Sequence, residues 1–164
     1  REHLEFYSLE DLTEFVFRIA KKLNVIITDD AATEVAIRSR STPRIANNRL
    51  RWVRDFAQSK AQGKITLDVA RGALEMAEID SLGLDRQDRR YLDTLIRVCL
   101  GGPTGIGTIA ATMNTVTDTL EDEVEPFLLR SELILRTPRG RVATAKAFKH
   151  MNIEPPKGGQ PSLF

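Results

Sequence analysis

Cysteine, histidine and long apolar runs are nearly absent from this sequence of 164 residues. The single cysteine, Cys99, excludes an intramolecular disulfide and a cysteine-rich zinc site. The two histidines, His3 and His150, lie at opposite ends of the chain, so we expect no metal site built on them. No apolar run approaches the length of a membrane span, about 20 residues, and no signal-peptide pattern opens the chain. We therefore expect a cytoplasmic protein with no metal bound to this chain and no membrane association.

Aromatic residues are also few, at 6% of the sequence, so the core must be built mostly from Leu, Ile, Val and Ala. Hydrophobic residues (41%) and charged residues (29%) occur in the proportions of a globular protein. The net charge of +1 gives no sign of a nucleic-acid binder, so any such sign must come from the distribution of charge. The sequence begins with Arg1 rather than Met, which predicts a fragment, a processed chain or an edited chain.

Apolar residues recur every three or four positions in four segments of the first 80 residues, which predicts four helices. Each segment begins at a hydroxyl residue that can cap a helix, and these residues are Ser8, Thr28, Thr42 and Thr66. Proline directly follows Thr42, at the first helical position, where it is favoured. Residues 80–83 are predicted to form a joint. We therefore predict a four-helix domain at residues 1–80.

Three further helices are predicted after the joint. The first begins near Asp85 and is broken by the glycine-rich stretch at residues 101–103, which we interpret as a loop. The second is short and turns Ile109 and its apolar neighbours inward. The third begins at Thr117 and contains Pro126, which should kink the helix or mark a boundary in it.

A β-hairpin is predicted after these helices, with strands at residues 133–136 and 141–144. Thr137-Pro138-Arg139-Gly140 suits a type I turn, with Pro at the second position and Gly at the fourth. Three helices followed by a hairpin is the element order of a winged helix. We predict a winged-helix domain at residues 81–154 and a disordered tail at residues 155–164.

Charge divides sharply in the second half of the chain. Residues 117–125 contain five acidic and no basic side chains, whereas residues 126–164 contain seven basic and two acidic ones. The third helix of a usual helix-turn-helix reader enters the major groove, where this acidic segment would meet phosphate repulsion. The hairpin is the better candidate for DNA contact, and its arginines are Arg136, Arg139 and Arg141.

Contacts between such arginines and phosphates carry no sequence information. We therefore expect DNA binding that depends on DNA structure and salt rather than on base sequence. The alternative from the residues alone is a hairpin that exposes a few solvated arginines.

Five pieces of the sequence, in this order, resemble the RuvB family, and they are residues 4–7, 40–47 with 53–57, 101–103, 125–128 and 136–144. The resemblance spans residues 4 to about 153. It implies a mainly α fold, with a four-helix AAA+ lid domain followed by a winged-helix domain whose wing is a β-hairpin. The family consists of AAA+ ATPases that work as homohexameric rings on Holliday junctions. The resemblance thus implies ATP-dependent branch migration in DNA recombination, DNA repair and the SOS response.

The resemblance also assigns roles to individual residues. Arg44 occupies the position of the second sensor arginine, and Tyr7 that of a tyrosine beside the nucleotide. Arg136 and Arg141 match DNA-contacting positions of the wing, and we add Arg139, which lies between them at the turn. The alternatives are a surface role for Arg44 on a basic helix and hinge packing for Tyr7. Ser41 departs from the glycine that the family usually has before Thr-Pro-Arg, and Ser131-Glu132 from a usual Gln-Gly.

No Gly-x-x-x-x-Gly-Lys-Ser/Thr loop occurs in the sequence. We therefore expect no catalytic residue in this chain and no ATP hydrolysis by it alone. ATP and Mg²⁺ would belong to the intact parent, which the resemblance pairs with RuvA and RuvC. We expect the isolated chain to be a monomer.

Three other hypotheses about the function of this chain are compatible with parts of the sequence. The chain could be a winged-helix transcription regulator, a protein-interaction module, or the lid and DNA-binding domain of another AAA+ protein such as a clamp loader or replication initiator. The acidic third helix disfavours the first reading, and the Arg-Thr-Pro-Arg-Gly-Arg hairpin disfavours the third.

Overall fold

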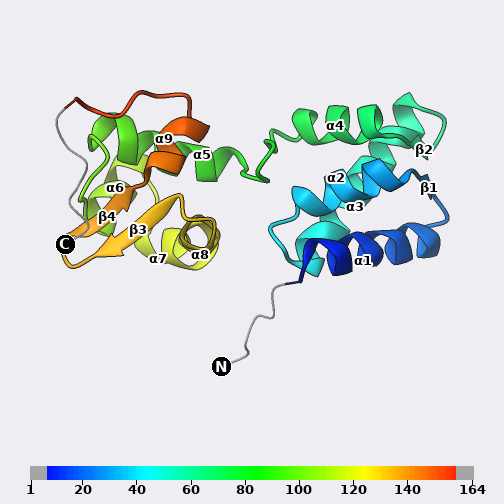
Figure 1. Ribbon diagram of the computed structural model, residues 1–164, viewed down its shortest axis with the longest axis horizontal. Helices are drawn as coiled ribbons and strands as arrows, with labels where there is room; N and C mark the ends of the chain where they lie inside the picture. The colour runs from blue at the N-terminus through cyan, green and yellow to red at the C-terminus, as the bar shows by residue number, and fades with distance from the viewer. Residues whose placement is uncertain (1–6, 158–164) are drawn as a thin grey trace. The chain divides into compact units, whose positions relative to one another are not determined.

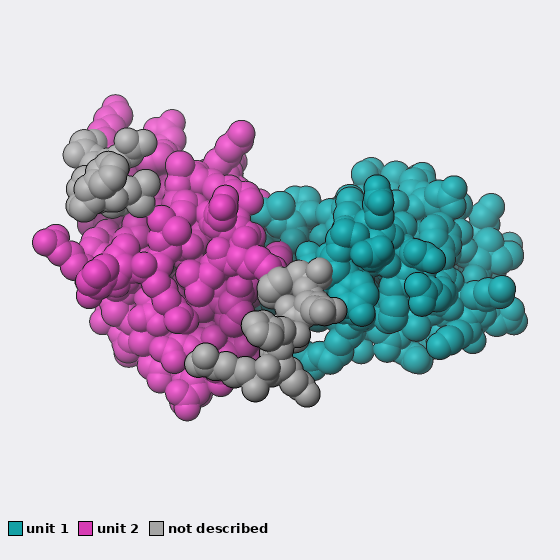
Figure 2. Space-filling model, turned by 60° about the horizontal axis from the view of Figure 1, so that its bottom comes forward, with its two compact units in different colours: residues 1–85 teal, residues 86–164 magenta. Residues whose placement is uncertain are grey.

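The computed structural model describes residues 7–157, and the chain divides at Asp85 into two compact units. Figure 2 shows these as unit 1 and unit 2 in different colours. This division lies five residues beyond the predicted domain boundary at residue 80. Residues 158–164, most of the tail that we predicted to be disordered, lie outside the described residues. No helix between residues 7 and 157 combines the length and the apolar character that crossing a bilayer requires.

Unit 1 contains the four predicted helices and one pair of very short strands (Figure 1). The elements, in chain order, are α1 (Leu9–Lys22), β1 (Ile26–Ile27), α2 (Asp29–Ile37), α3 (Pro43–Lys60), β2 (Lys64–Ile65) and α4 (Leu67–Met76). Sequence analysis missed the strands because two residues are too few to show a period of two. They pair in parallel and tie the loop before α2 to the loop before α4.

Three of the four predicted helix caps are confirmed, with the hydroxyl oxygens of Ser8, Thr28 and Thr66 each accepting a hydrogen bond from a backbone N–H three residues on. The prediction for Thr42 was wrong in part. Thr42 occupies the cap position and Pro43 the first turn, but the Thr42 hydroxyl donates to the carbonyl of Ser39 at 3.3 Å. Small and aliphatic side chains make the core of unit 1, where α1, α2, α3 and α4 bury their apolar stripes against one another.

The segment between the units is a tightly bonded turn. The Asp80 carboxylate accepts from the backbone N–H groups of Leu82 and Leu84, both at 3.0 Å, and the backbone N–H of Asp80 donates to the Leu84 carbonyl. Gly83 has φ +86°, and a Cβ there would lie 2.8 Å from the Arg38 carbonyl oxygen. Only glycine satisfies both the backbone angle and this close approach.

Unit 2 contains helices, two π-helical segments and one hairpin. Its elements, in chain order, are α5 (Arg86–Asp93), η1 (Thr94–Val98), α6 (Ile106–Met113), α7 (Thr117–Thr119), η2 (Leu120–Val124), α8 (Glu125–Arg130), β3 (Ile134–Thr137), β4 (Gly140–Ala143) and α9 (Ala145–His150). Together with unit 1, this order confirms the mainly α fold and the winged-helix arrangement. The closing helix α9, capped by Thr144, was not predicted.

The third predicted helix of this unit is divided at the expected place. A boundary between η2 and α8 falls one residue before Pro126. The backbone N–H of Glu125 donates to the carbonyl of Leu120, five residues back, as in a π-turn. Proline has no N–H to donate into the ladder, so a change of helix type is reasonable there.

The predicted hairpin is confirmed, with each strand one residue closer to the turn than predicted: Arg136 lies opposite Arg141 and Thr137 opposite Gly140. The glycine-rich stretch is more than the loop we predicted, because Thr104 pairs with Arg141 through N–H···O bonds of 3.0 and 2.7 Å. A Cβ on Gly102 would lie 2.1 Å from the Arg141 carbonyl oxygen, and one on Gly140 would lie 2.5 Å from that of Thr104. The glycines let the two backbones touch and so hold the hairpin against the helices.

Candidate nucleic-acid interface

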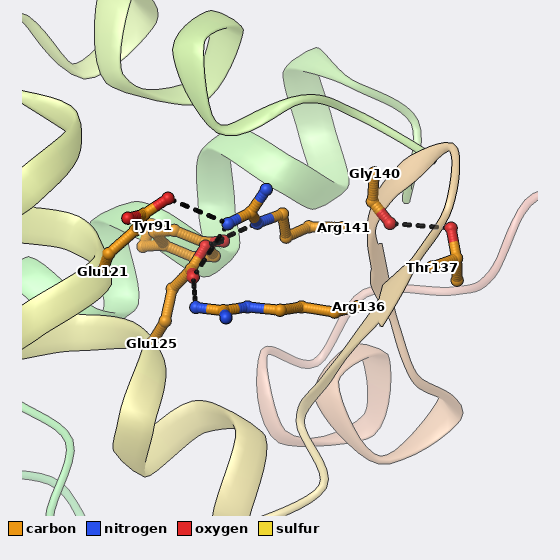
Figure 3. A network of polar contacts seen from close by, with 7 residues as sticks. All are labelled: Tyr91, Glu121, Glu125, Arg136, Thr137, Gly140 and Arg141. Carbon is orange, nitrogen blue, oxygen red and sulfur yellow. Dashed lines mark hydrogen bonds and ion pairs between the residues drawn. The ribbon is translucent and has the colours of Figure 1, made fainter.

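Two wing arginines point back toward the helices rather than away from them (Figure 3). Arg136 and Arg141 face each other across the strand pair, so their side chains share one face of the hairpin. Two like charges in this arrangement repel each other, and a counter-charge between them is required for stability. The α8 residue Glu125 supplies it.

Glu125 is fully buried and accepts hydrogen bonds from three side chains. Arg136 donates to Glu125 Oε2 at 2.6 Å, and Arg141 donates through Nε to Oε1 at 2.9 Å and through Nη2 to Oε2 at 3.3 Å. The hydroxyl of Tyr91, from α5, donates to Oε1 at 2.7 Å. Arg141 also reaches Glu121 at 3.3 Å. These five side chains, which we call the wing brace, join α5, η2, α8 and the hairpin.

The brace keeps its carboxylate charged in spite of its burial. Burial raises the pKa of Glu125, but the hydrogen bonds from Arg141, Tyr91 and Arg136 outweigh it and hold the pKa below 4.5. The bond to Glu125 raises the pKa of Arg141. Burial, and then the bond to Glu125, raise the pKa of Tyr91 well above its usual range. At neutral pH the brace therefore consists of two cations, two carboxylates and a neutral phenol.

The three predicted DNA-contacting arginines differ in their freedom. The side chain of Arg141 is 15% exposed and that of Arg136 is 50% exposed. Arg139 lies exposed at the turn, and its side chain makes no hydrogen bond or ion pair with any residue that the structure describes. Its backbone N–H donates to the Thr137 hydroxyl at 3.3 Å, which holds the turn. The structure thus brings Arg136 and Arg141 together and leaves Arg139 apart from them.

The two predicted nucleotide residues lie on neighbouring segments of unit 1. The backbone N–H of Tyr7 donates to the Ser41 carbonyl at 3.2 Å, which places Tyr7 beside the entry to α3. Arg44 is the second residue of α3 and is exposed, and its side chain makes no hydrogen bond or ion pair with residues 7–157. The first turn of a helix carries free N–H groups and a partial positive charge, so an anion is favoured next to Arg44.

Ser41 has φ +57°, and Arg40 before it has φ +56°. Both residues are therefore left-handed at the point where the chain turns into α3. Glycine adopts this conformation without strain, whereas an L side chain costs roughly 1–2 kcal/mol there. Ser41 therefore stands at a position whose backbone angle favours glycine.

A second arginine cluster, which sequence analysis missed, lies inside unit 1. Arg40 Nε and Arg49 Nη2 both donate to the Gly83 carbonyl at 3.2 Å, and Arg38 Nη1 donates to the Ile79 carbonyl at 3.1 Å. All three side chains are buried. Burial, followed by the charge of Arg40, lowers the pKa of Arg49 to about 10. The cluster fastens the segment at residues 79–85 to the lid helices.

The sequence does contain signals for the arginine cluster of unit 1 and for Glu125 of the wing brace, in the spacing of the helical residues. Arg49 lies three residues after Ala46 and four before Val53, which places it within the apolar stripe of α3. Glu125 lies three residues before Leu128 and so borders the apolar stripe of the third helix. A charged residue inside such a stripe indicates a buried ion pair or a bond to backbone.

Metal-binding geometry is not found in the part of the chain that the structure describes, where no three His, Cys, Asp or Glu side chains gather to hold an ion.

The fold and these arginines define a two-part class of protein: a helical lid domain followed by a winged helix with a basic, braced hairpin. The first part matches the family model described as the RuvB AAA lid domain, over residues 7–80, and the second matches the RuvB C-terminal winged helix domain, over residues 81–152. The chain therefore belongs to the RuvB family.

Relatives and solved structures agree with this assignment. The chain is 61% identical over 156 residues to the Holliday junction branch migration complex subunit RuvB of Rhodopirellula baltica, and 52% identical over 155 residues to that of Corynebacterium jeikeium. These alignments cover 95% and 94% of the chain but 43% and 44% of the relatives. The structure of the Thermotoga maritima RuvB Holliday junction branch migration motor matches with a TM-score of 0.90 and 41% identity, over 93% of this chain and 51% of that one.

The chain thus spans less than half the length of the curated relatives it matches. The two family matches also decide between the families considered from the sequence. Both domains match models described as RuvB domains, and this favours RuvB over a transcription regulator, a clamp loader or a replication initiator.

Proposed function

We propose that this chain is the nucleotide-sensing lid and DNA-holding winged helix of RuvB, the ATP-driven motor that migrates Holliday junctions during recombination and repair. The proposal that the winged helix holds DNA rests on the exposed side chain of Arg139, which lies on a hairpin that is fixed to its own domain. The relatives' names, which refer to Holliday junction branch migration, support the remainder.

The wing holds duplex DNA through its phosphates. An arginine at a turn reaches outward, and its guanidinium suits phosphate oxygens. The third helix is unsuited to the groove because Asp122 and Glu123 are exposed on it. DNA binding by the wing is therefore independent of base sequence, as a motor that moves along DNA requires.

The lid reads the nucleotide through Arg44, with Tyr7 beside it. Arg44 fits a phosphate contact because it is exposed, its side chain bonds to no described residue, and it lies in the first turn of α3. In the intact protein, ATP with Mg²⁺ would bind in the ATPase domain, and its hydrolysis would supply the energy for branch migration. Arg44 would contact the γ-phosphate, so the loss of that phosphate on hydrolysis would change the angle of the lid. The chain by itself hydrolyses no ATP.

The intact protein acts as a homohexamer on duplex DNA, with RuvA and RuvC at the junction, in the bacterial cytoplasm. The isolated chain is a monomer. Light scattering of the chain should give the mass of one copy, and a stable hexamer would contradict this.

Fluorescence anisotropy of the chain with labelled duplex and four-way junction, across a salt series from about 50 to 200 mM, tests the DNA-holding part. Binding should be weak, independent of sequence and lost as salt rises. Replacing Arg136, Arg139 and Arg141 together by Glu should abolish it. A wild-type chain that binds neither DNA at the lowest salt, or one that prefers a particular base sequence, would contradict the proposal.

A chimera tests the nucleotide part. This chain would replace the matching 156 residues of the Rhodopirellula relative, to which it is 61% identical. Arg44→Ala in the chimera should strongly reduce DNA-stimulated ATP hydrolysis and branch migration. Arg51→Ala, an exposed arginine on the same helix that bonds to Asn47, is the control. Equal activity of the two variants would remove Arg44 from the proposed role.

A further inference from the structure

The segment that carries the proposed nucleotide contact also carries two buried arginines. Arg44 lies in the first turn of α3, and Arg49 lies five residues later on the same helix, a distance of about 7.5 Å along its axis. Arg40 directly precedes Ser41, whose carbonyl accepts a hydrogen bond from the backbone N–H of Tyr7. A movement of this segment in response to nucleotide therefore moves both buried arginines with it.

Both arginines bind one backbone atom of the connection between the units. Arg40 Nε and Arg49 Nη2 each donate to the carbonyl oxygen of Gly83 at 3.2 Å. A carbonyl oxygen has two lone pairs, so it can accept both bonds at once. Because both side chains are buried, the bonds lie where water competes little and hydrogen bonds are strong. Gly83 is thus fastened both to α3 and to the residue that leads into it.

The rest of the connection is bonded to unit 1 as well. At its start, the carbonyl of Ile79 accepts from Arg38 Nη1 at 3.1 Å, and at its end the Asp85 carboxylate pairs with Arg40 at 3.6 Å. The backbone between these points is closed into the turn described above. Helix α5 begins at Arg86, the next residue. Bonds to the lid therefore extend up to the residue where the winged helix starts.

We propose that Arg40 and Arg49 are positioning residues for the winged helix. By binding the Gly83 carbonyl, they make residues 79–85 move with the lid. The pivot between the two units is then confined to the end of unit 1, at Asp85, and a lid movement is not absorbed in a slack linker. This rests on the nucleotide-sensing function proposed above. Neither arginine is among the residues to which the resemblance assigns a role.

The electrostatics of Arg49 favour a positioning role over a stabilising one. Burial and the charge of Arg40 lower the pKa of Arg49 to about 10, and its Nη1 has no hydrogen-bond partner among the described residues. An apolar side chain of similar volume would avoid this cost. It would not supply a directed bond to the Gly83 carbonyl, and that bond is what the arginine adds.

Gly83 fits the same role from the other side of the bond. Its φ is +86°, and a Cβ there would lie 2.8 Å from the Arg38 carbonyl oxygen and 3.1 Å from Arg49 Nη1. Gly83→Ala therefore has to push the turn away from the arginines. It provides a second variant, made in the connection itself and not in the lid helices.

The chimera described above tests the proposal when ATP hydrolysis, DNA binding and branch migration are measured together. Arg40→Met combined with Arg49→Met should leave DNA binding and hydrolysis without DNA unchanged. It should lower DNA stimulation of hydrolysis, and branch migration, by about fivefold or more, as for typical couplings between sites. Gly83→Ala should act in the same direction. Arg49→Lys keeps a donor and should retain most of the coupling, and the exposed Arg51→Met is the control.

Backbone amide relaxation of the ¹⁵N-labelled chain tests the connection itself. In the wild type, the {¹H}–¹⁵N NOE of residues 79–84 should be as high as that of α3. In the double methionine variant it should fall, while the Trp52 fluorescence transition in urea shows that the lid is still folded. Single Arg49→Met replaces the double variant if the latter does not fold. Low NOE values in the wild-type connection would overturn the proposal.

Two outcomes in the chimera would also overturn it. One is a double variant that keeps full DNA stimulation and branch migration. The other is a variant that loses hydrolysis without DNA by the same factor as branch migration, because this indicates general damage and not lost coupling. If Arg44→Ala changes neither activity, the nucleotide-sensing function fails instead. The relaxation measurement then still decides whether the connection moves with the lid.

Discussion

Both units hold arginines through hydrogen bonds, but the acceptors and the burial of the arginines differ. In unit 1, the buried Arg40 and Arg49 both donate to the backbone carbonyl of Gly83, and Arg40 also pairs with the Asp85 carboxylate at 3.6 Å. In unit 2, Arg136 and Arg141 share the fully buried carboxylate of Glu125. The first arrangement fastens a connecting segment to a domain, and the second fastens a hairpin.

The difference appears in the electrostatics. Burial and the nearby Arg40 lower the pKa of Arg49 to about 10, whereas the bond to Glu125 raises the pKa of Arg141. One nitrogen of Arg49, Nη1, has no hydrogen-bond partner among the described residues. Arg49 thus bonds to backbone and lies beside another cation, although Arg40 also pairs with Asp85 at 3.6 Å, whereas Arg141 bonds directly to a buried carboxylate. Substitutions should affect the two units unequally.

The largest effect should come from Glu125→Ala. It leaves two arginines and a tyrosine without their shared acceptor, and breaking a buried ion pair in this way costs about 3–5 kcal/mol. Urea unfolding measures it. Trp52, the single tryptophan, reports on unit 1 by its fluorescence, while far-UV circular dichroism follows both units. Only the dichroism transition should shift, and Glu123→Ala should shift neither. A change in the Trp52 transition would show that the brace is not confined to unit 2.

Arg141→Met and Arg49→Met compare the two clusters directly. Losing Arg141 should cost roughly 2 kcal/mol, because it removes charge-assisted bonds to a buried carboxylate. Losing Arg49 should cost about 1 kcal/mol or less, since the Gly83 carbonyl keeps Arg40 as a donor and a like-charge repulsion is relieved. Equal losses in urea unfolding would contradict the claim that the buried carboxylate separates the two clusters.

The elements that could be predicted from the sequence are those marked by periodic apolar residues, by helix-capping residues or by turn residues. The helices of unit 1 were predicted from apolar spacing, and the hairpin from the turn residues Thr137-Pro138-Arg139-Gly140. The family was predicted from pieces too short to identify it singly. For the candidate site, the sequence predicted roles for the wing arginines and for Arg44, and these roles stay predictions.

Long-range contacts were beyond sequence reasoning. The pairing of Thr104 with Arg141 joins residues far apart in the chain, and nothing near Gly102 indicates it. The acidic segment and the basic hairpin were correctly separated as charge blocks, but a charge count does not show that Glu125 and Arg141 meet. The partners of Arg49 likewise lie 34 residues further along the chain.

Acid should affect unit 2 more than unit 1. The pKa of Glu125 is lower in the folded chain than its ordinary value of 4.5, so its contribution to stability is complete above pH 4.5 and is lost as pH falls through the lower, folded pKa. The dichroism midpoint of wild type should therefore fall as the pH drops below 4.5, and that of Glu125→Gln should fall less steeply. Parallel curves for the two proteins would contradict this coupling.

The smallest expected effect is a gain. Ser41→Gly replaces an L residue at φ +57° by the residue that adopts this angle freely, and should stabilise unit 1 by up to about 1 kcal/mol. The Trp52 transition should move to higher urea while that of unit 2 stays in place. A loss of stability would mean that the Ser41 side chain contributes more than the relief of backbone strain returns.

The most direct test of the account is a titration of the ¹⁵N-labelled chain with a short duplex, followed through its backbone amide signals. The largest shifts should occur at residues 136–141, which carry the three wing arginines, and unit 1 should be unaffected. Raising the salt should reverse them. Shifts centred on residues 117–125, or on the helices of unit 1, would contradict the claim that the braced wing is the part that holds DNA.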